Sequence, residues 1–234
     1  HDTINAKSYI YLPYEVLFSV AEYTYKEYGE IQDIPDHLKI KPNPITIQPA
    51  IAEEIETSYK GDLIQTEGIV WKHVSDLISK SKHQHSSNIS QLCFLWEYAY
   101  DNWIYIHDPE TSNHEDRWRS ASETIETYYF NTNKKYTGDC DDFAILVASF
   151  ARQIGLKSRF VGAYNISGGH AFAEFYVSND EWDSTIKDIH NSFGNVKIHS
   201  YPDSKGKWVN LDWWAKHVGG PYWKEGNIRK VYGL

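Results

Sequence analysis

Methionine is absent from this chain of 234 residues, and cysteine occurs only twice. Two cysteines allow one disulfide at most, which is too few to staple a small secreted scaffold, so they indicate chemistry or core packing. Without methionine, His1 is not a translation start, and we expect that a preceding segment has been removed. A cleaved export signal is the interpretation that we favour, which places the protein in the periplasm or outside the cell.

Long hydrophobic runs and clustered basic residues are also missing. No stretch reaches the roughly 18 consecutive apolar residues of a membrane-spanning helix. The formal net charge is −9 without a Lys/Arg stripe, which argues against a nucleic-acid partner. There is no phosphate-binding glycine motif, dinucleotide-binding motif, zinc pattern or EF-hand pattern. The pair His83 and His85 lacks a third residue at a spacing typical of metal ligands. The sequence therefore predicts no transmembrane segment, no cofactor and no metal.

The first third of the chain has helical patterns. Hydrophobic residues make up 41% of an otherwise ordinary composition, enough for one full core. Apolar residues recur at helical spacing over 12–28, 50–59 and 62–80, and a proline-rich stretch at 31–49 predicts an extended connector. We expect residues 1–88 to be a helical N-terminal extension packed on a core of residues 89–234, in one structural unit.

The second part changes from helices to strands. The segment ISQLCFLWEYAYDNW predicts a helix that buries Cys93 as a small apolar residue, and Ser120 with Glu123 has the spacing of a capping box. From Lys157 onward, KSRFVGAY, HAFAEFYV and KWVNLDWW alternate as short strands. Helices followed by an antiparallel sheet predict an α+β fold.

The segment GDCDDFAILVASFARQIG predicts a central helix that is apolar on most sides, with Cys140 in its first turn. Unpaired N–H groups and the helix dipole favour a thiolate there and can hold an oxyanion. Three acidic neighbours, Asp139, Asp141 and Asp142, act in the opposite direction because negative charge raises a thiol pKa. We interpret Asp141 and Asp142 as helix-capping residues, and we predict Cys140 to be a catalytic nucleophile.

His170 is the base that we assign to Cys140. It opens the strand HAFAEFYV directly after two glycines, where backbone can approach closely. The residue that orients it should be an acid or amide in apolar surroundings, as Asp212 is between Leu211 and Trp213. Asp183 also follows a tryptophan and is nearer in sequence. We favour Asp212.

Trp103 and Tyr136 are the candidates for a side-chain oxyanion donor, with core packing as the alternative interpretation of both. Tryptophans also crowd the C-terminal segment, where they suit core packing or a binding shelf.

The motifs around these residues resemble the transglutaminase-like superfamily of papain-fold cysteine enzymes. The resemblance is carried by GDCDDFA, RFVGAY, GGHAFAEFYV and WVNLDWW, in the order Cys, His, Asp, with WEYAYDNWIYIHDP and SASETIE upstream. It implies a nucleophile helix packed on an antiparallel sheet. It also implies acyl transfer at an amide: water resolves the acyl-enzyme in a peptidase or amidase, and an amine does so in a cross-linker.

About 40 residues separate His170 from Asp212, which is longer than the hairpin common in the family, so IKDIHNSFGNVKIHSYPDSKGK is interpreted as an insertion. The calcium-regulated, multi-domain architecture of animal transglutaminases does not fit this length, so the resemblance implies a microbial-type hydrolase or amidase acting on a peptide or protein substrate. A catalytically silent binding module and a structural interaction domain remain alternatives. Specificity is expected from loops at 108–119 and 178–206.

Overall fold

The computed structural model describes residues 52–56, 59–108, 117–165, 168–223 and 228–233. The chain divides into two compact units, residues 1–48 and 49–234, and every described residue belongs to the second. The helix predicted at 12–28 and the proline-rich connector lie outside the described residues. In the described part of the chain, no helix has the length and apolarity to cross a membrane.

A six-stranded sheet forms the centre of the described unit. Its strand order is β1-β8-β4-β5-β7-β6, with every neighbouring pair antiparallel except the parallel pair of β1 and β8. The strands are β1 (Ala52–Glu56), β4 (Ser158–Asn165), β5 (Gly168–Ser178), β6 (Ser200–Pro202), β7 (Gly206–Asn210) and β8 (Ile228–Tyr232). A separate parallel pair consists of β2 (Trp103–Tyr105) and β3 (Tyr136–Gly138).

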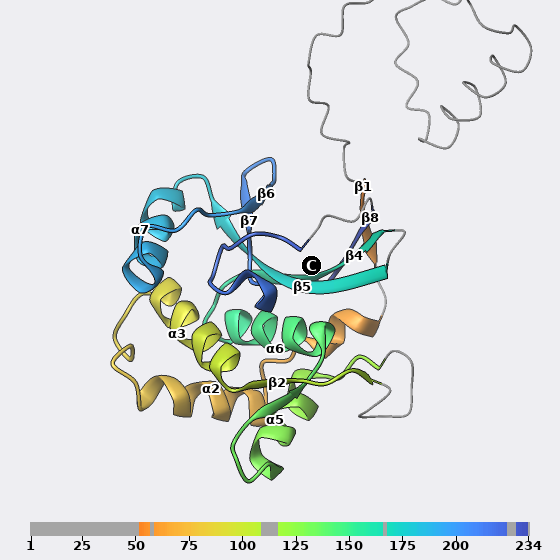
Figure 1. Ribbon diagram of the computed structural model, residues 1–234. Coiled ribbons are helices and arrows are strands. Elements are labelled where there is room, and N and C mark those ends of the chain that lie inside the picture. The colour runs from red at the N-terminus through yellow and green to blue at the C-terminus, as the bar shows by residue number, and fades with distance from the viewer. Residues whose placement is uncertain (1–51, 57–58, 109–116, 166–167, 224–227, 234) are drawn as a thin grey trace, which may run out of the picture. The chain divides into compact units, whose positions relative to one another are not determined.

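The helices gather on one side of this sheet, with α6 next to β5 and the others around it (Figure 1). They are α2 (Ile69–Ser79), α3 (Asn88–Asp101), α5 (Ala121–Phe130), α6 (Cys140–Gln153) and α7 (Trp182–Phe193), with 3-10 turns η2 (Tyr59–Leu63) and η3 (Trp213–Ala215). The predicted α+β fold is therefore confirmed, as is the capping box of Ser120 and Glu123 at the start of α5.

Helix α6 is the centre of the core, as its sequence predicts. Every residue from Asp141 to Ala151 is buried. A helix that is apolar on most sides must be covered on most sides, and α6 packs on β4 and β5 with α2, α3 and α5 around it. This packing fixes the position of the helix N-terminus, where Cys140 lies.

Three local predictions differ from the structure. Residues 52–56, expected to be helical, form β1, because their backbone pairs with β8 from the far end of the chain. The strand expected through Trp214 ends at Asn210, and Asp212 instead caps η3. The segment interpreted as an insertion begins inside α7 and includes residues 186–193 of this helix, which packs against α3.

His73 is a buried histidine inside the helical layer. Its exposed fraction is 2%, and its ring nitrogens lie 3.0 Å from the Tyr129 hydroxyl and 2.5 Å from the Tyr136 hydroxyl. Burial lowers the pKa of His73 to about 4, against the opposing charge of Asp76. The fold therefore holds this imidazole neutral.

We expect His73 to make the fold less stable in mild acid. The unfolded chain takes up a proton near pH 6.5 and the folded chain only near pH 4, so the stabilisation is complete above 6.5 and is lost as the pH falls toward 4. The two values imply a loss of roughly 3 kcal/mol. Urea unfolding of the Tyr136→Phe variant should show this loss, and the double variant Tyr136→Phe/His73→Phe should lack it. Equal pH dependence in the two variants would contradict the assignment.

Candidate active site

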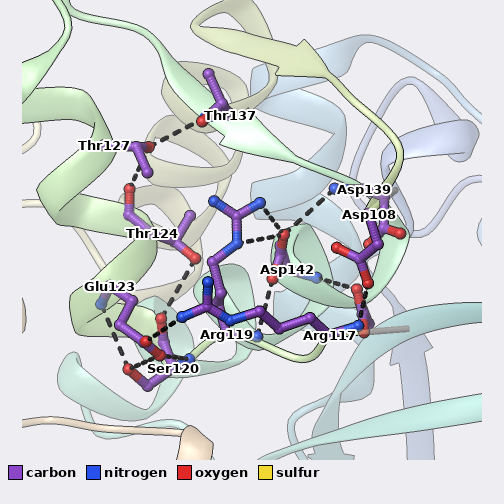
Figure 2. A network of polar contacts seen from close by, with 11 residues as sticks. Asp108, Arg117, Arg119, Ser120, Glu123, Thr124, Thr127, Thr137, Asp139 and Asp142 are labelled. Atoms are coloured by element: carbon purple, nitrogen blue, oxygen red, sulfur yellow. Dashed lines mark hydrogen bonds and ion pairs between the residues drawn. The ribbon is translucent and has the colours of Figure 1, made fainter. Parts of the chain in front are cut away.

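The N-terminus of α6 is held by a buried ion pair. Asp142, in the first turn, accepts hydrogen bonds from Arg119 Nη2 at 2.6 Å, Arg119 Nε at 3.0 Å and the Arg119 backbone N–H at 3.0 Å. Its carboxylate also accepts the N–H of Asp139, which completes a capping box (Figure 2). Asp142 thus serves as the capping residue that the sequence indicated, and it also fixes the loop before α5.

Cys140 is the first residue of α6 and is partly exposed. Its sulfur accepts a hydrogen bond from the backbone N–H of Ala171, the residue after His170. The Tyr105 hydroxyl also forms a hydrogen bond with Cys140. The sulfur therefore lies where the helix N-terminus, the start of β5 and the end of β2 converge.

The surroundings of Cys140 disfavour the thiolate. Burial is the largest cause, and the carboxylates of Asp139, Asp141 and Asp212 act in the same direction, so that the pKa of Cys140 rises to about 12 despite the Ala171 N–H. Asp139 and Asp141 thus raise the pKa of Cys140, as the sequence predicted. The helix N-terminus does not outweigh them.

The His170 side chain is 9% exposed and its Nε2 lies 2.8 Å from Oδ2 of Asp212, which is completely buried. Because this contact occupies Nε2, Nδ1 is the nitrogen that remains for a proton transfer. The Trp223 ring packs on the imidazole with 5.2 Å between ring centroids. The structure thus brings the sequence-predicted His170 and Asp212 together.

Asp212 is fixed in place by its neighbours. Its Oδ1 accepts the backbone N–H of Trp214 at 3.1 Å, and its own N–H donates to Oδ1 of Asn210 at 3.1 Å. One residue earlier, the Leu211 carbonyl accepts the indole N–H of Trp96 from α3 at 2.9 Å. Asp183, the competing acid from the sequence, is an exposed residue in the first turn of α7.

The two oxyanion candidates from the sequence lie in the aromatic packing around β2 and β3. Tyr136 is fully buried with its hydroxyl on His73. Trp103 packs edge-on against Phe143, at 5.1 Å between ring centroids, and its buried indole N–H has no hydrogen-bond partner. Sequence reasoning missed Tyr105, two residues after Trp103. Strand alternation over WIY places both rings on one face and could have suggested it.

A second group missed by the sequence analysis is a cluster of carboxylates beside Cys140. One oxygen each from Asp108, Asp139 and Asp141 lies within 4.8 Å of the others. Asp108 accepts the backbone N–H of Arg117, and Asp108 and Asp139 lie next to the Asp142 network in Figure 2. Burial, then the neighbouring Asp139 carboxylate, raises the pKa of Asp141 well above its usual range. The spacing of Asp139 and Asp141 around Cys140 was visible in sequence, but the approach of Asp108 was not.

A buried network of charged residues supports β5 from the face opposite α6. The carboxylate of Glu174 is completely buried and accepts hydrogen bonds from Arg159 at 2.8 Å, Arg229 at 2.7 Å and the Tyr222 hydroxyl at 2.7 Å. Tyr222 immediately precedes Trp223, which packs on His170. Glu174 thus links β5 to the segment that covers the histidine.

One known protein family matches the part of the chain that carries Cys140 and His170. The family model of the transglutaminase-like superfamily matches residues 75–185, which include Cys140 and His170. None of the curated proteins compared with the chain matches it. This part of the chain thus matches the transglutaminase-like superfamily that the sequence motifs indicated.

Two solved structures match the chain at low identity. A Cytophaga hutchinsonii protein provisionally named a cysteine protease matches with 18% identity and a TM-score of 0.37, over 70% of this chain and 46% of its own. The match thus spans less than half of that protein. Legionella pneumophila LapG, solved in its calcium-bound form, matches with 18% identity and a TM-score of 0.36, over 68% of this chain and 73% of its own.

Proposed function

We propose that this protein is a cysteine-dependent acyl-transfer enzyme acting on amide bonds of peptides or proteins, with Cys140 as nucleophile, His170 as general base and Asp212 as the residue that orients His170. The observation that carries the proposal is the 2.8 Å contact of His170 Nε2 with the buried Asp212, directly next to the residue whose N–H binds the Cys140 sulfur. A carboxylate that holds one ring nitrogen fixes the tautomer and leaves the other for proton transfer.

The reaction begins when a lone pair of the Cys140 sulfur forms a bond to the substrate carbonyl carbon. The thiol proton passes to Nδ1 of His170, and the π electron pair of the carbonyl moves to its oxygen. When the carbonyl re-forms, the C–N bond breaks, and the imidazolium proton goes to the departing amine. Water then attacks the thioester in a hydrolase, or a second amine does so in a cross-linking enzyme.

The test is transfer of an acetyl group from p-nitrophenyl acetate to the protein, located by peptide mass mapping. We expect a thioester on Cys140 and none on Cys93, because Cys93 is 1% exposed and burial raises its pKa to about 12. The Cys93→Ala variant should be acylated like the wild type, whereas Cys140→Ala should not be acylated and His170→Ala should react at least about 100-fold more slowly. Acylation that does not depend on His170 would contradict the proposal.

We also propose that Asp108, Asp139 and Asp141 bind one divalent cation. Oxygen ligands lie about 2.4 Å from Ca²⁺, so oxygens up to about 4.8 Å apart can share one ion. The three carboxylates meet this requirement, and Oδ2 of Asp141 has no hydrogen-bond partner although the residue is only 3% exposed. A set of ligands made only of oxygen favours Ca²⁺ or Mg²⁺ over Zn²⁺. The bound ion would supply positive charge that offsets the three carboxylates.

Calorimetric titration with CaCl₂ and MgCl₂ tests this site without an activity assay. We expect one ion per chain, and at 100 times its Kd the ion should stabilise the fold by about 2.7 kcal/mol. The Asp141→Asn variant should bind at least about tenfold more weakly, since it loses one charged ligand. Asp180→Asn, an exposed acid outside the cluster, should bind like the wild type. If neither cation produces heat or a thermal shift, the cluster is held by a shared proton and not by a metal.

A further inference from the structure

The hydroxyl of Tyr105 contacts the Cys140 sulfur, and the proposed roles of the Cys140, His170 and Asp212 side chains do not use it. Tyr105 is the last residue of β2, and the parallel register places it opposite Gly138, two residues before Cys140. The residue after β2 fixes this pairing, because the Ile106 N–H donates to the Gly138 carbonyl at 2.9 Å. The backbone thus places Tyr105 next to the N-terminus of α6.

The ring of Tyr105 is held on its other side by the segment that follows Asp212. Its centroid lies 4.9 Å from that of Trp213, and Trp213 packs in turn against Trp214. Burial, followed by the nearby Cys140 and Asp139, raises the pKa of Tyr105 above its usual value. The phenol therefore stays protonated and can donate a hydrogen bond throughout the neutral range.

We propose that Tyr105 is a catalytic residue whose hydroxyl donates a hydrogen bond to the oxyanion formed when Cys140 attacks a carbonyl. The inference rests on the proposed acyl-transfer function. In the tetrahedral intermediate, the oxygen is attached to the carbon that is bonded to sulfur. A donor within reach of the sulfur is therefore also within reach of that oxygen. Because the donor is already held by Trp213, it needs little rearrangement when charge develops.

A hydrogen bond to the oxyanion has a different effect from a hydrogen bond to the sulfur alone. Two reactions of the same thiol distinguish these two roles. Acylation by p-nitrophenyl acetate creates an oxyanion, whereas alkylation by iodoacetamide displaces iodide and creates none. Loss of an oxyanion donor typically lowers the rate about 10²–10³-fold. A donor that acts only on the sulfur should influence both reactions alike.

The experiment measures both rate constants at one pH for the wild type and for Tyr105→Phe, which keeps the ring on Trp213. We expect acylation to fall about 100-fold and alkylation to change less than about threefold. Tyr100→Phe, whose ring stacks on Trp96 in α3, should match the wild type in both. Unchanged acylation, or an equal fall of the two rates, overturns the role of Tyr105 alone. If the wild type itself is not acylated on Cys140, the proposed function fails and this role fails with it.

Discussion

Replacing Asp212 with asparagine is expected to lower the acylation rate of Cys140 by about four orders of magnitude, as the corresponding change does in a Ser-His-Asp triad. The amide is nearly isosteric, so it can still accept the Trp214 N–H. It cannot carry the charge that stabilises an imidazolium, and its NH₂ group would turn His170 to the wrong tautomer. The effect should therefore be on the rate and not on the fold.

Asp183→Asn is the matched control, because Asp183 is the acid that sequence reasoning placed in competition with Asp212. It lies exposed in the first turn of α7, and its substitution should leave the acylation rate within about twofold of the wild type. The measurement is the p-nitrophenolate burst on mixing with p-nitrophenyl acetate, with circular dichroism to verify the fold. The assignment of Asp212 is wrong if its asparagine variant keeps a tenth or more of the wild-type rate.

Glu174→Gln is expected to cause the largest loss of stability. The exposed fractions of Arg159, Arg229 and Glu174 are 2%, 4% and 0%, so two buried guanidinium groups would face a neutral amide in place of a carboxylate. Removing one partner from a buried ion pair costs about 3–5 kcal/mol. The free energy of unfolding in urea should fall by about this amount.

A surface ion pair in the same protein provides the control for Glu174. Arg117 and Glu123 are 3.0 Å apart, but their side chains are 47% and 44% exposed. Arg117→Ala keeps the backbone N–H that Asp108 accepts, and it should change the free energy of unfolding by less than about 1 kcal/mol, because exposed pairs are hydrated and screened. If both variants lose the same free energy of unfolding, the buried network does not stabilise the fold more than the surface ion pair does.

Loss of Glu174 should also change the site, because its carboxylate accepts the hydroxyl of Tyr222 next to Trp223. Glu174 therefore belongs to the buried ion-pair network and also contacts the segment that packs on His170. That connection joins β5, β8 and the segment after η3, and no short stretch of sequence contains it.

The sequence alone determined the elements whose signal is local. Helix α6 is apolar on most sides, so it had to be central, and the placement of Cys140 in its first turn followed from that pattern. Ser120 with Glu123 specifies a helix start through contacts within four residues. The motifs around Cys140 and His170 indicated the superfamily for the same reason, since each lies within one short segment.

The tertiary structure decided everything that depends on partners far apart in the chain. Residues 52–56 became a strand because β8 offers free backbone groups 176 positions away, from Ala52 to Ile228, and pairing outweighs a helical pattern in so short a segment. Likewise, Asp141 and Asp142 both follow Cys140, and the sequence predicts the same capping role for both. In the structure, Asp142 pairs with Arg119, whereas Asp141 lies close to Asp108.

The choice between chemically equivalent side chains was also tertiary. Sequence reasoning could name Asp212 and Asp183 as acids beside tryptophans, but only the pairing of β5 with β7 brings Asp212 to His170 while α7 carries Asp183 to solvent. It named Trp103 and Tyr136 in the aromatic segments, yet the β2–β3 register carries Tyr105 to the sulfur. Local sequence determines which chemical groups are present and how each segment folds, whereas packing between distant segments determines which of those groups meet.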